Sequence, residues 1–272
     1  MWMKLLLLVG ILAASGWAGD PKYEVYSAEL VKKAEAGDAK AQFDLGWCYY
    51  CATYADGDHF LNPVVEDKNE AVKWWTKSSE QGNGEAQYYL GSCYYKGDGT
   101  AVDYKEAVKW FTKSAEQGNA QAQCILGLYY INGAGVTQDH REAVKWLTKS
   151  AEQGNADAQH NLGLSYIKGA GVTQDYQEAV RLLTKAAEQG IEGAQSRLGV
   201  LYYQGEGVTK DLTEAVKWFT KSAEQGNAKT QFLLSLCYAK GEGVTKDKEE
   251  SVKWLTKSLE PRSEPAKNIL EH

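Results

Sequence analysis

Residues 106–120 read EAVKWFTKSAEQGNA, and the same letters return as residues 214–228. The two copies lie 108 residues apart, which is three times a spacing of 36 residues that runs through the chain. Two series of glycines keep this spacing, the second of them within the motif LGxxY: Gly82, Gly118, Gly154, Gly190 and Gly226, then Gly91, Gly127, Gly163 and Gly199. Self-similarity at a fixed period of this length is the signature of a repeat solenoid.

Each period is expected to form two helices, here named helix A and helix B. A glycine followed by asparagine, as in Gly118-Asn119, supplies a left-handed stop for one helix and an N-cap for the next. Helix A then carries Ala122 and Leu126 at helical spacing, and its internal Gly127 would allow a packed neighbour to approach closely. Because a lone helix pair cannot bury both of its faces, the pattern predicts a stack of such pairs.

Helix B begins after an aspartate such as Asp139, whose side chain can accept hydrogen bonds from exposed backbone amides. Three residues later, Glu142 is expected to complete a reciprocal capping box. The same pair recurs in every repeat: Asp67/Glu70, Asp103/Glu106, Asp139/Glu142, Asp175/Glu178, Asp211/Glu214 and Asp247/Glu250. Helix B is expected to bury a stripe that includes Leu147 and Ala151, while Trp146 reaches the adjacent repeat.

The period predicts six repeats flanked by two capping half-repeats. The repeats are residues 38–81, 82–117, 118–153, 154–189, 190–225 and 226–261, and the half-repeats are residues 20–37 and 262–272. The first repeat contains nine additional residues between Gly46 and Asp67. This insertion carries Phe60, and aromatic insertions on one face of a solenoid often lie at a binding surface.

Residues 1–19 have the pattern of a secretory signal peptide. A single charge at Lys4 precedes an apolar stretch from Leu5 to Ala14, and small residues follow up to Gly19. The apolar stretch is about half of the ~20 residues that a membrane-spanning helix requires, so we expect no stable membrane insertion. With cleavage after Ala18 or Gly19, the mature chain is expected to be secreted or periplasmic, and monomeric.

Composition excludes two broad classes of protein. With 30 basic and 36 acidic residues the formal charge is −6, which disfavours nucleic acid as a partner. A hydrophobic share of 43% with 24% charged residues is too apolar for a chain that is mainly disordered.

The full motif, LGxxYxxGxGVxxDxxEAVKWxxKAAEQG, resembles the Sel-one-like repeat family, a longer relative of the tetratricopeptide repeat. One repeat matches the motif at many positions: Leu198, Gly199, Tyr202, Gly205, Gly207, Val208, Asp211, Glu214, Ala215 and Trp218. The resemblance implies an all-α, right-handed superhelical solenoid that acts as an adaptor for other proteins. It also implies that helices A line the concave surface.

Three positions of helix A are candidates for the binding surface: two before, two after and five after the LG glycine. They share a helical stripe and change identity from repeat to repeat, which recognition or unselected drift would both explain. The predicted partner-binding residues are Tyr89, Lys96, Tyr129, Asn132, Asn161, Lys168, Arg197, Gln204 and Lys240, together with Phe60. Helix B is nearly invariant, even at lysines such as Lys113 and Lys221, and recent duplication would explain that uniformity.

Five cysteines in an exported chain leave at least one unpaired in a monomer. Cys48, Cys93 and Cys237 take one equivalent position, and equivalent helices in a stack lie roughly 9–10 Å apart. A disulfide requires Cα atoms within about 7 Å, so mostly free, buried thiols are expected. A redox role for Cys48 and Cys51, or a zinc site that adds Cys93 and His59, is a minor alternative.

The leading functional hypothesis is a non-enzymatic, exported adaptor that binds a protein or peptide without metal or cofactor. The alternative is a hydrolase of cell-wall or β-lactam amides, because some cysteine-rich relatives are described as β-lactamase-like and Ser165 and Lys168 have SxxK spacing. No SDN or KTG motif follows, and both residues take ordinary positions of helix A. A third hypothesis is a spacer that binds nothing tightly.

Overall fold

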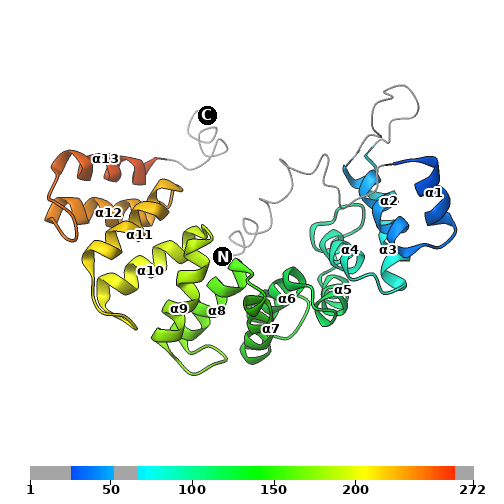
Figure 1. The fold of residues 1–272 in the computed structure, drawn as a ribbon, viewed down its shortest axis with the longest axis horizontal. Helices are drawn as coiled ribbons and strands as arrows, with labels where there is room; N and C mark the ends of the chain where they lie inside the picture. The colour runs from blue at the N-terminus through cyan, green and yellow to red at the C-terminus, as the bar shows by residue number, and fades with distance from the viewer. Residues whose placement is uncertain (1–25, 52–65, 261–272) are drawn as a thin grey trace. The chain divides into compact units, whose positions relative to one another are not determined.

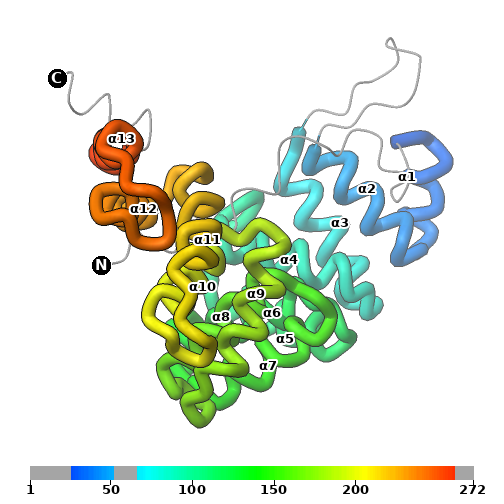
Figure 2. The backbone as a smooth tube through the Cα atoms, turned by 60° about the vertical axis from the view of Figure 1, so that its left-hand side comes forward, coloured from blue at the N-terminus to red at the C-terminus, as the bar shows by residue number. Residues whose placement is uncertain are grey.

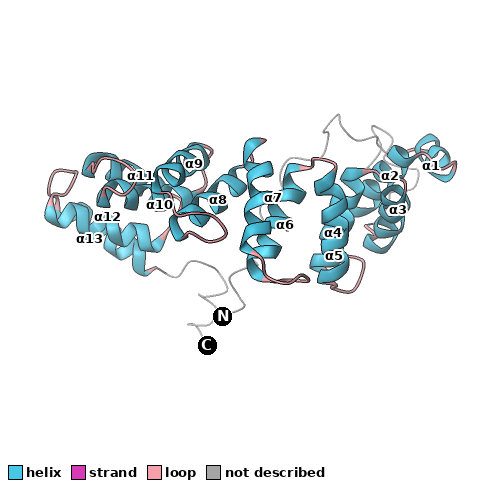
Figure 3. Cartoon of the chain, turned by 90° about the horizontal axis from the view of Figure 1, so that it is seen from below, coloured by secondary structure: helices cyan, strands magenta, loops and turns pink. Residues whose placement is uncertain are grey.

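The computed structural model describes residues 26–51 and 66–260, and within these ranges every regular element is an α-helix. The chain divides into two compact units, residues 1–119 and 120–272, which we call the N-terminal and C-terminal units. Figure 1 labels the helices, and Figure 3 shows the short loops that join them. None of the described helices is both long and apolar enough to cross a membrane.

The helices of each unit pack against their neighbours in chain order. The N-terminal unit contains α1 (Ala28–Glu35), α2 (Ala39–Cys51), α3 (Lys68–Glu80), α4 (Gly84–Lys96) and α5 (Tyr104–Glu116). The C-terminal unit contains α6 (Ala120–Asn132), α7 (His140–Glu152), α8 (Ala156–Lys168), α9 (Tyr176–Glu188), α10 (Glu192–Gln204), α11 (Leu212–Glu224), α12 (Ala228–Lys240) and α13 (Lys248–Leu259). Even-numbered helices are helices A, and odd-numbered helices from α3 onward are helices B. The predicted all-α solenoid of helix pairs is confirmed, and Figure 2 follows its path through each unit.

The turn from helix B to the next helix A is built as the sequence predicts. Gly154 has φ +89°, in the left-handed region, and open space surrounds the position of a Cβ there. The following Asn155 accepts a hydrogen bond from the backbone N–H of Ala158 and caps α8. At the start of α10 the asparagine is replaced by Ile191, and that helix has no side-chain cap. The left-handed glycine therefore fixes this turn, while the asparagine cap can be dispensed with.

The second glycine of the GxG loop lies directly against the preceding repeat in four loops, at Gly99, Gly171, Gly207 and Gly243. A Cβ added at Gly171 would lie 2.0 Å from the backbone oxygen of His140, at the start of α7. Gly207 and Gly243 meet the starts of α9 and α11 in the same way, and both have positive φ. Since only glycine fits so close to backbone and also adopts this conformation, these loops couple their repeats to the preceding ones.

The LG glycine lets helix A approach its own helix B closely, as expected. A Cβ at Gly127 would lie 2.7 Å from Cγ of Leu147, and a Cβ at Gly199 would lie 2.5 Å from Cδ1 of Phe219. Phe219 and Leu147 are at most 2% exposed, so the side chains of helix B fill the space that the missing Cβ leaves.

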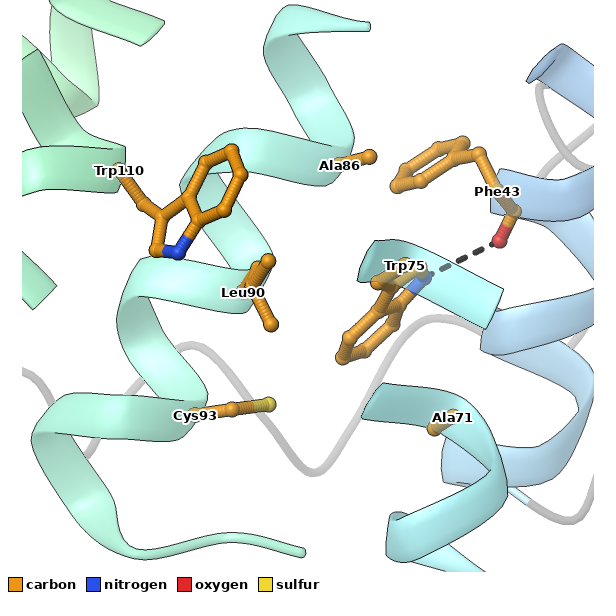
Figure 4. Packing of buried hydrophobic residues seen from close by; sticks show 7 residues of the cluster. All are labelled: Phe43, Ala71, Trp75, Ala86, Leu90, Cys93 and Trp110. Carbon is orange, nitrogen blue, oxygen red and sulfur yellow. Dashed lines mark hydrogen bonds between the residues drawn. The ribbon is translucent and has the colours of Figure 1, made fainter. Parts of the chain in front are cut away.

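The helix B tryptophan connects successive repeats. Trp218 packs against Leu183 and Ala187 of α9, in the preceding repeat, and against Leu198 of its own helix A. Figure 4 shows the equivalent arrangement in the N-terminal unit, where Trp110 and Leu90 form one cluster with Trp75. The tryptophan therefore reaches the adjacent repeat, as the sequence predicts. In α9 the position is taken by Leu182, which is 3% exposed.

Lysines one turn after these tryptophans cover their rings. The Nζ atoms of Lys113 and Lys221 lie 4.3 and 4.2 Å from the ring centroids of Trp110 and Trp218. Equivalent pairs are Lys77 with Trp74, Lys149 with Trp146, and Lys257 with Trp254. The lysine is attracted to the ring face and shields it from water. These lysines perform the same packing role in five repeats. This shared role explains their uniformity without recent duplication.

A buried glutamine of helix A joins the two helices B that flank it. The Nε2 atom of Gln159 donates to the carbonyl of Ala151 in α7, at 3.2 Å. Its Oε1 atom accepts from Nε2 of Gln189, just after α9, at 2.9 Å. Gln195 makes the same two contacts one repeat later. The side chain of Gln159 is 4% exposed, and both its N–H donor and its carbonyl oxygen are hydrogen-bonded. This buried polar group therefore has the partners that it needs.

The predicted capping box is only half correct. The Oδ1 atom of Asp139 accepts from the backbone N–H groups of Arg141 and Glu142 at 2.9 and 3.1 Å, as expected. The backbone N–H of Asp139, however, donates to the carbonyl of Tyr130 at 2.9 Å, so Glu142 has no donor to accept. Glu142 instead pairs with Lys145 at 2.8 Å. The reciprocal part of the prediction is wrong because helix A supplies the acceptor.

Within the described residues, some contacts between repeats occur only at particular junctions. The hydroxyl of Tyr203 donates to Glu242 at 2.7 Å, and Thr230 donates to Ser196 at 2.7 Å. The first of these has an equivalent in the N-terminal unit, where the hydroxyl of Tyr50 donates to Asp98 at 3.0 Å. These pairs distinguish junctions that otherwise share the same glycine, tryptophan and glutamine contacts.

Candidate protein-binding surface

The helices A of the C-terminal unit lie side by side. Nδ2 of Asn155, the N-cap of α8, donates to Gln121 of α6 at 3.0 Å, and the contact between Thr230 and Ser196 joins α12 to α10. Between α8 and α10, a Cβ at Gly193 would lie 3.2 Å from Cε1 of His160. The outward faces of α6, α8, α10 and α12 therefore form one continuous surface, which we call the helix A surface.

The position two after the LG glycine does not belong to this surface. It is buried in all six helices A, where it is taken by Cys48, Cys93, Tyr129, Ser165, Leu201 and Cys237. Leu201, for example, packs with Leu183 of the preceding helix B. Tyr129 is 3% exposed, so its prediction as a partner-binding residue is wrong. At 100° per residue, this position has already turned away from solvent toward the neighbouring helix B.

The position five after the glycine is exposed in every helix A. It carries predicted binding residues in five of them: Lys96, Asn132, Lys168, Gln204 and Lys240. At the position two before the glycine, Arg197 is exposed and Asn161 is half-buried. Nδ2 of Asn161 donates to the carbonyl of Asp157 at 2.8 Å, so this amide is already engaged within α8.

Sequence reasoning missed one row of the surface, the residue directly after the LG glycine. In the C-terminal unit this row is aliphatic and half-buried, and consists of Leu128, Leu164, Val200 and Leu236. It lies three residues after the position two before the glycine and four residues before the position five after it, so the three positions share one face of the helix. A helical projection centred on those two positions would have identified it.

Tyr89 belongs to an aromatic cluster of the N-terminal unit. Its ring stacks on Trp75 at 5.5 Å between centroids and meets Trp47 edge to face at 4.7 Å. The ring centroid of Phe43 lies 5.8 Å from that of Tyr89. Tyr89 therefore supports the packing of α2, α3 and α4 as well as lying half-exposed on helix A. Phe60, predicted for the same region, lies outside the described residues.

All five cysteines lie within the described residues and are free thiols, in agreement with the expectation of mostly free thiols. Burial raises the pKa of Cys93 and Cys124 to about 12, and that of Cys51 and Cys237 to about 11. These side chains are therefore protonated near neutral pH, where the thiol is a poor nucleophile. A redox role for the CxxC pair has no support from this environment.

No metal cluster is found among the residues that the structure describes, where no three His, Cys, Asp or Glu side chains converge. His59, the suggested additional ligand of a zinc site, lies outside those residues. The serine of the SxxK spacing is 7% exposed, and its Oγ atom donates to the carbonyl of Asn161 at 3.0 Å. Lys168 is exposed, and in the described structure no hydrogen bond joins it to Ser165. A buried hydroxyl held by backbone is poorly placed to attack an amide.

His160 is the most perturbed basic group on the helix A surface. Its imidazole is packed over Gly193, and Nδ1 is buried without a hydrogen-bond partner in the described structure. Burial, together with the smaller effect of the positive charge of Arg197, lowers its pKa from 6.5 to about 4. The histidine is therefore neutral in the folded protein near neutral pH.

The stability of the C-terminal unit is expected to fall between pH 6.5 and pH 4 because of His160. The unfolded chain takes up a proton near pH 6.5, whereas the folded chain takes it up near pH 4. The stabilisation is thus complete above pH 6.5 and is lost as the pH falls through this window, by about 3 kcal/mol at most. Urea unfolding at several pH values should show this loss, and His160→Gln should remove it. An unchanged pH dependence in the variant would contradict the assignment.

The fold and surface define a repeat scaffold built from stacked helix pairs. The model of the Sel1 repeat matches residues 39–83, 84–119, 120–155, 156–191, 193–227 and 228–260, and so covers most of the chain. The chain belongs to the Sel1 repeat family, whose members are typically protein-interaction scaffolds. A comparison with curated proteins finds no match.

Two solved structures are similar to this chain. The protective antigen c5321 of uropathogenic Escherichia coli strains, which displays an SLR fold, is 38% identical with a TM-score of 0.78. The alignment covers 86% of this chain and 48% of the E. coli chain, so this chain spans about half of that protein. A Sel1 repeat protein from Oxalobacter formigenes is 30% identical with a TM-score of 0.71, over 87% of this chain and 98% of the other.

Proposed function

We propose that this protein is an exported, non-catalytic scaffold that binds a segment of another protein across the helix A surface. The observation that carries the proposal is the continuous surface of α6, α8, α10 and α12, where half-buried aliphatic residues lie beside exposed polar ones. Such a combination suits an extended segment or a helix of a partner, because apolar area supplies affinity and polar groups fix the register.

The contrast with helix B supports this choice of surface. The charged side chains of helix B interact with other residues of the same helix: Glu142 pairs with Lys145, Glu214 pairs with Lys217, and Lys149 covers Trp146. The same pattern repeats with little variation. Side chains that already serve the fold have less freedom to specify a partner, whereas the exposed positions of helix A differ between repeats.

The location outside the cytoplasm rests on residues 1–19, whose pattern is that of a signal peptide. The E. coli relative is described as a protective antigen, which fits exposure at or beyond the cell envelope. We accordingly propose a secreted or periplasmic protein that acts as a monomer.

Removing polar side chains from the helix A surface is expected to weaken partner binding at least tenfold. The test variant combines Lys168→Ala, Arg197→Ala and Gln204→Ala, all at exposed positions. A matched control combines Arg141→Ala and Lys185→Ala, which are exposed on helices B. Tenfold corresponds to about 1.4 kcal/mol, a modest share for three interface residues.

The measurement is affinity capture from extract with the mature chain, followed by titration calorimetry with the purified partner. Both variants should be as helical as the parent chain by circular dichroism. Equal binding by the parent, the test variant and the control would show that the partner uses another surface. Amide hydrolysis that is lost in Ser165→Ala would instead support the hydrolase alternative.

A further inference from the structure

Several positive charges on the helix A surface of the C-terminal unit have no anionic neighbour. Lys168, Arg197 and Lys229 are exposed, and within the described structure none of them forms an ion pair. Some cations on the helices B of the same unit are paired, as Arg181 and Lys217 are with Glu178 and Glu214. The unpaired charges are therefore available to a ligand.

The acidic groups on the same helices do not offset this charge. The carboxylate of Glu192 accepts hydrogen bonds from Ser222 and Asn227, so it faces the interior of the repeat junction. Asp157 is half-buried, and α6, α8, α10 and α12 together carry four Lys or Arg side chains against the two carboxylates of Asp157 and Glu192. α6 carries no ionisable Lys, Arg, Asp or Glu at all. The surface is thus positive although the whole chain has a formal charge of −6.

The electrostatic environment of His160 is consistent with this charge distribution. The guanidinium of Arg197 lowers the pKa of that imidazole in addition to the effect of burial. The imidazole of His160 therefore lies within the electrostatic field of the Arg197 guanidinium.

Each of two cations lies one helical turn from a residue of the aliphatic row. Arg197 lies two residues before the LG glycine of α10, and Lys168 lies five residues after that of α8. Val200 follows Arg197 by three residues and Leu164 precedes Lys168 by four, so each aliphatic residue shares a helix face with its cation. A ligand that crosses this surface would meet an apolar residue and a positive charge on each of the two helices.

From this arrangement we infer that the helix A surface of the C-terminal unit recognises an acidic, extended protein segment. Its carboxylates would pair with Arg197 and Lys168, and its aliphatic side chains would cover Leu164 and Val200. This inference rests on the proposed function and specifies the chemistry of the partner. Arg197 is suited to the anchoring role, since its planar guanidinium can bind a carboxylate through two parallel hydrogen bonds.

The test uses an array of random decapeptides probed with the mature chain. We expect Asp and Glu to be enriched among the bound peptides, and the strongest acidic peptide to lose at least tenfold in affinity between 50 and 500 mM salt, in line with the screening of exposed charges at high ionic strength. The double variant Arg197→Glu/Lys168→Glu should abolish the enrichment. The control Arg141→Glu/Lys185→Glu changes the net charge equally on helices B and should preserve it.

The outcomes separate the two levels of the proposal. Bound peptides without acidic enrichment would overturn the inference while supporting a binding scaffold. An array without any bound peptide would count against both the inference and the proposed function. Two further outcomes would overturn the inference. If acidic enrichment survives in Arg197→Glu/Lys168→Glu, the acidic peptides bind at another surface. If a DNA duplex competes equally well, the surface binds negative charge of any kind and does not select an acidic protein segment.

Discussion

Trp218→Ala is expected to lower the free energy of unfolding of the C-terminal unit by about 3–5 kcal/mol. The indole is 8% exposed and packs between the helix B of the preceding repeat and its own helix A. Its removal leaves a cavity at the interface of two repeats and also deprives Lys221 of its ring contact. Since a repeat array owes its stability mainly to such interfaces, the loss affects neighbouring repeats together.

Leucine at the same position provides the matched control. Leu182 occupies the equivalent site in α9 and is 3% exposed, so the fold already accommodates this side chain there. Trp218→Leu should therefore lose less than half as much stability as Trp218→Ala. Urea unfolding followed by circular dichroism measures both. An equal loss in the two variants would show that the aromatic ring itself, rather than buried volume, holds the repeats together.

Gly171→Ala is expected to cost about 4 kcal/mol or more, because backbone strain and a steric clash act at the same residue. Gly171 has φ +76°, and its new Cβ would lie 2.0 Å from the backbone oxygen of His140. Backbone atoms cannot rotate away as a flexible side chain can. The A to B loop of the repeat must therefore move away from α7, which breaks the contact between the two repeats.

Gly154→Ala separates the two causes. Gly154 has a similar positive φ of +89°, but nothing lies within 4 Å of its added Cβ. This variant should lose only the conformational contribution, about 1–2 kcal/mol. Thermal and urea unfolding of the two variants can be compared directly. Equal destabilisation would mean that φ alone governs both positions and that the close approach to α7 is unimportant.

The elements that follow from local chemistry could be predicted from the sequence. Left-handed glycines such as Gly154 and aspartate N-caps such as Asp139 act within one turn of chain, so their spacing set the helix ends. The contact of the helix B tryptophan with the adjacent repeat could also be predicted, because an array of helix pairs leaves few other places for a large apolar side chain.

Contacts whose partner depends on tertiary geometry could not be predicted. Nothing in the local sequence indicates that Gln159 joins α7 to α9, or that the carbonyl of Tyr130 takes the donor expected for Glu142. The binding surface was partly misplaced for a similar reason. A difference of one residue turns a helix by 100°, which separates buried Tyr129 from half-buried Leu128.

The contacts found only at particular junctions bear on how faithfully the chain folds. Near-identical repeats can stack in the wrong order, since a helix A could find almost the same glycine, tryptophan and glutamine partners on a repeat further along. If the sixth repeat docked on the fourth, His160 would meet Lys229 where the native junction offers Gly193. Ser196 and Thr230 would be separated in such a stack. Small differences among the helices A thus act as an assembly code that raises the energy of shuffled stacks above that of the native order.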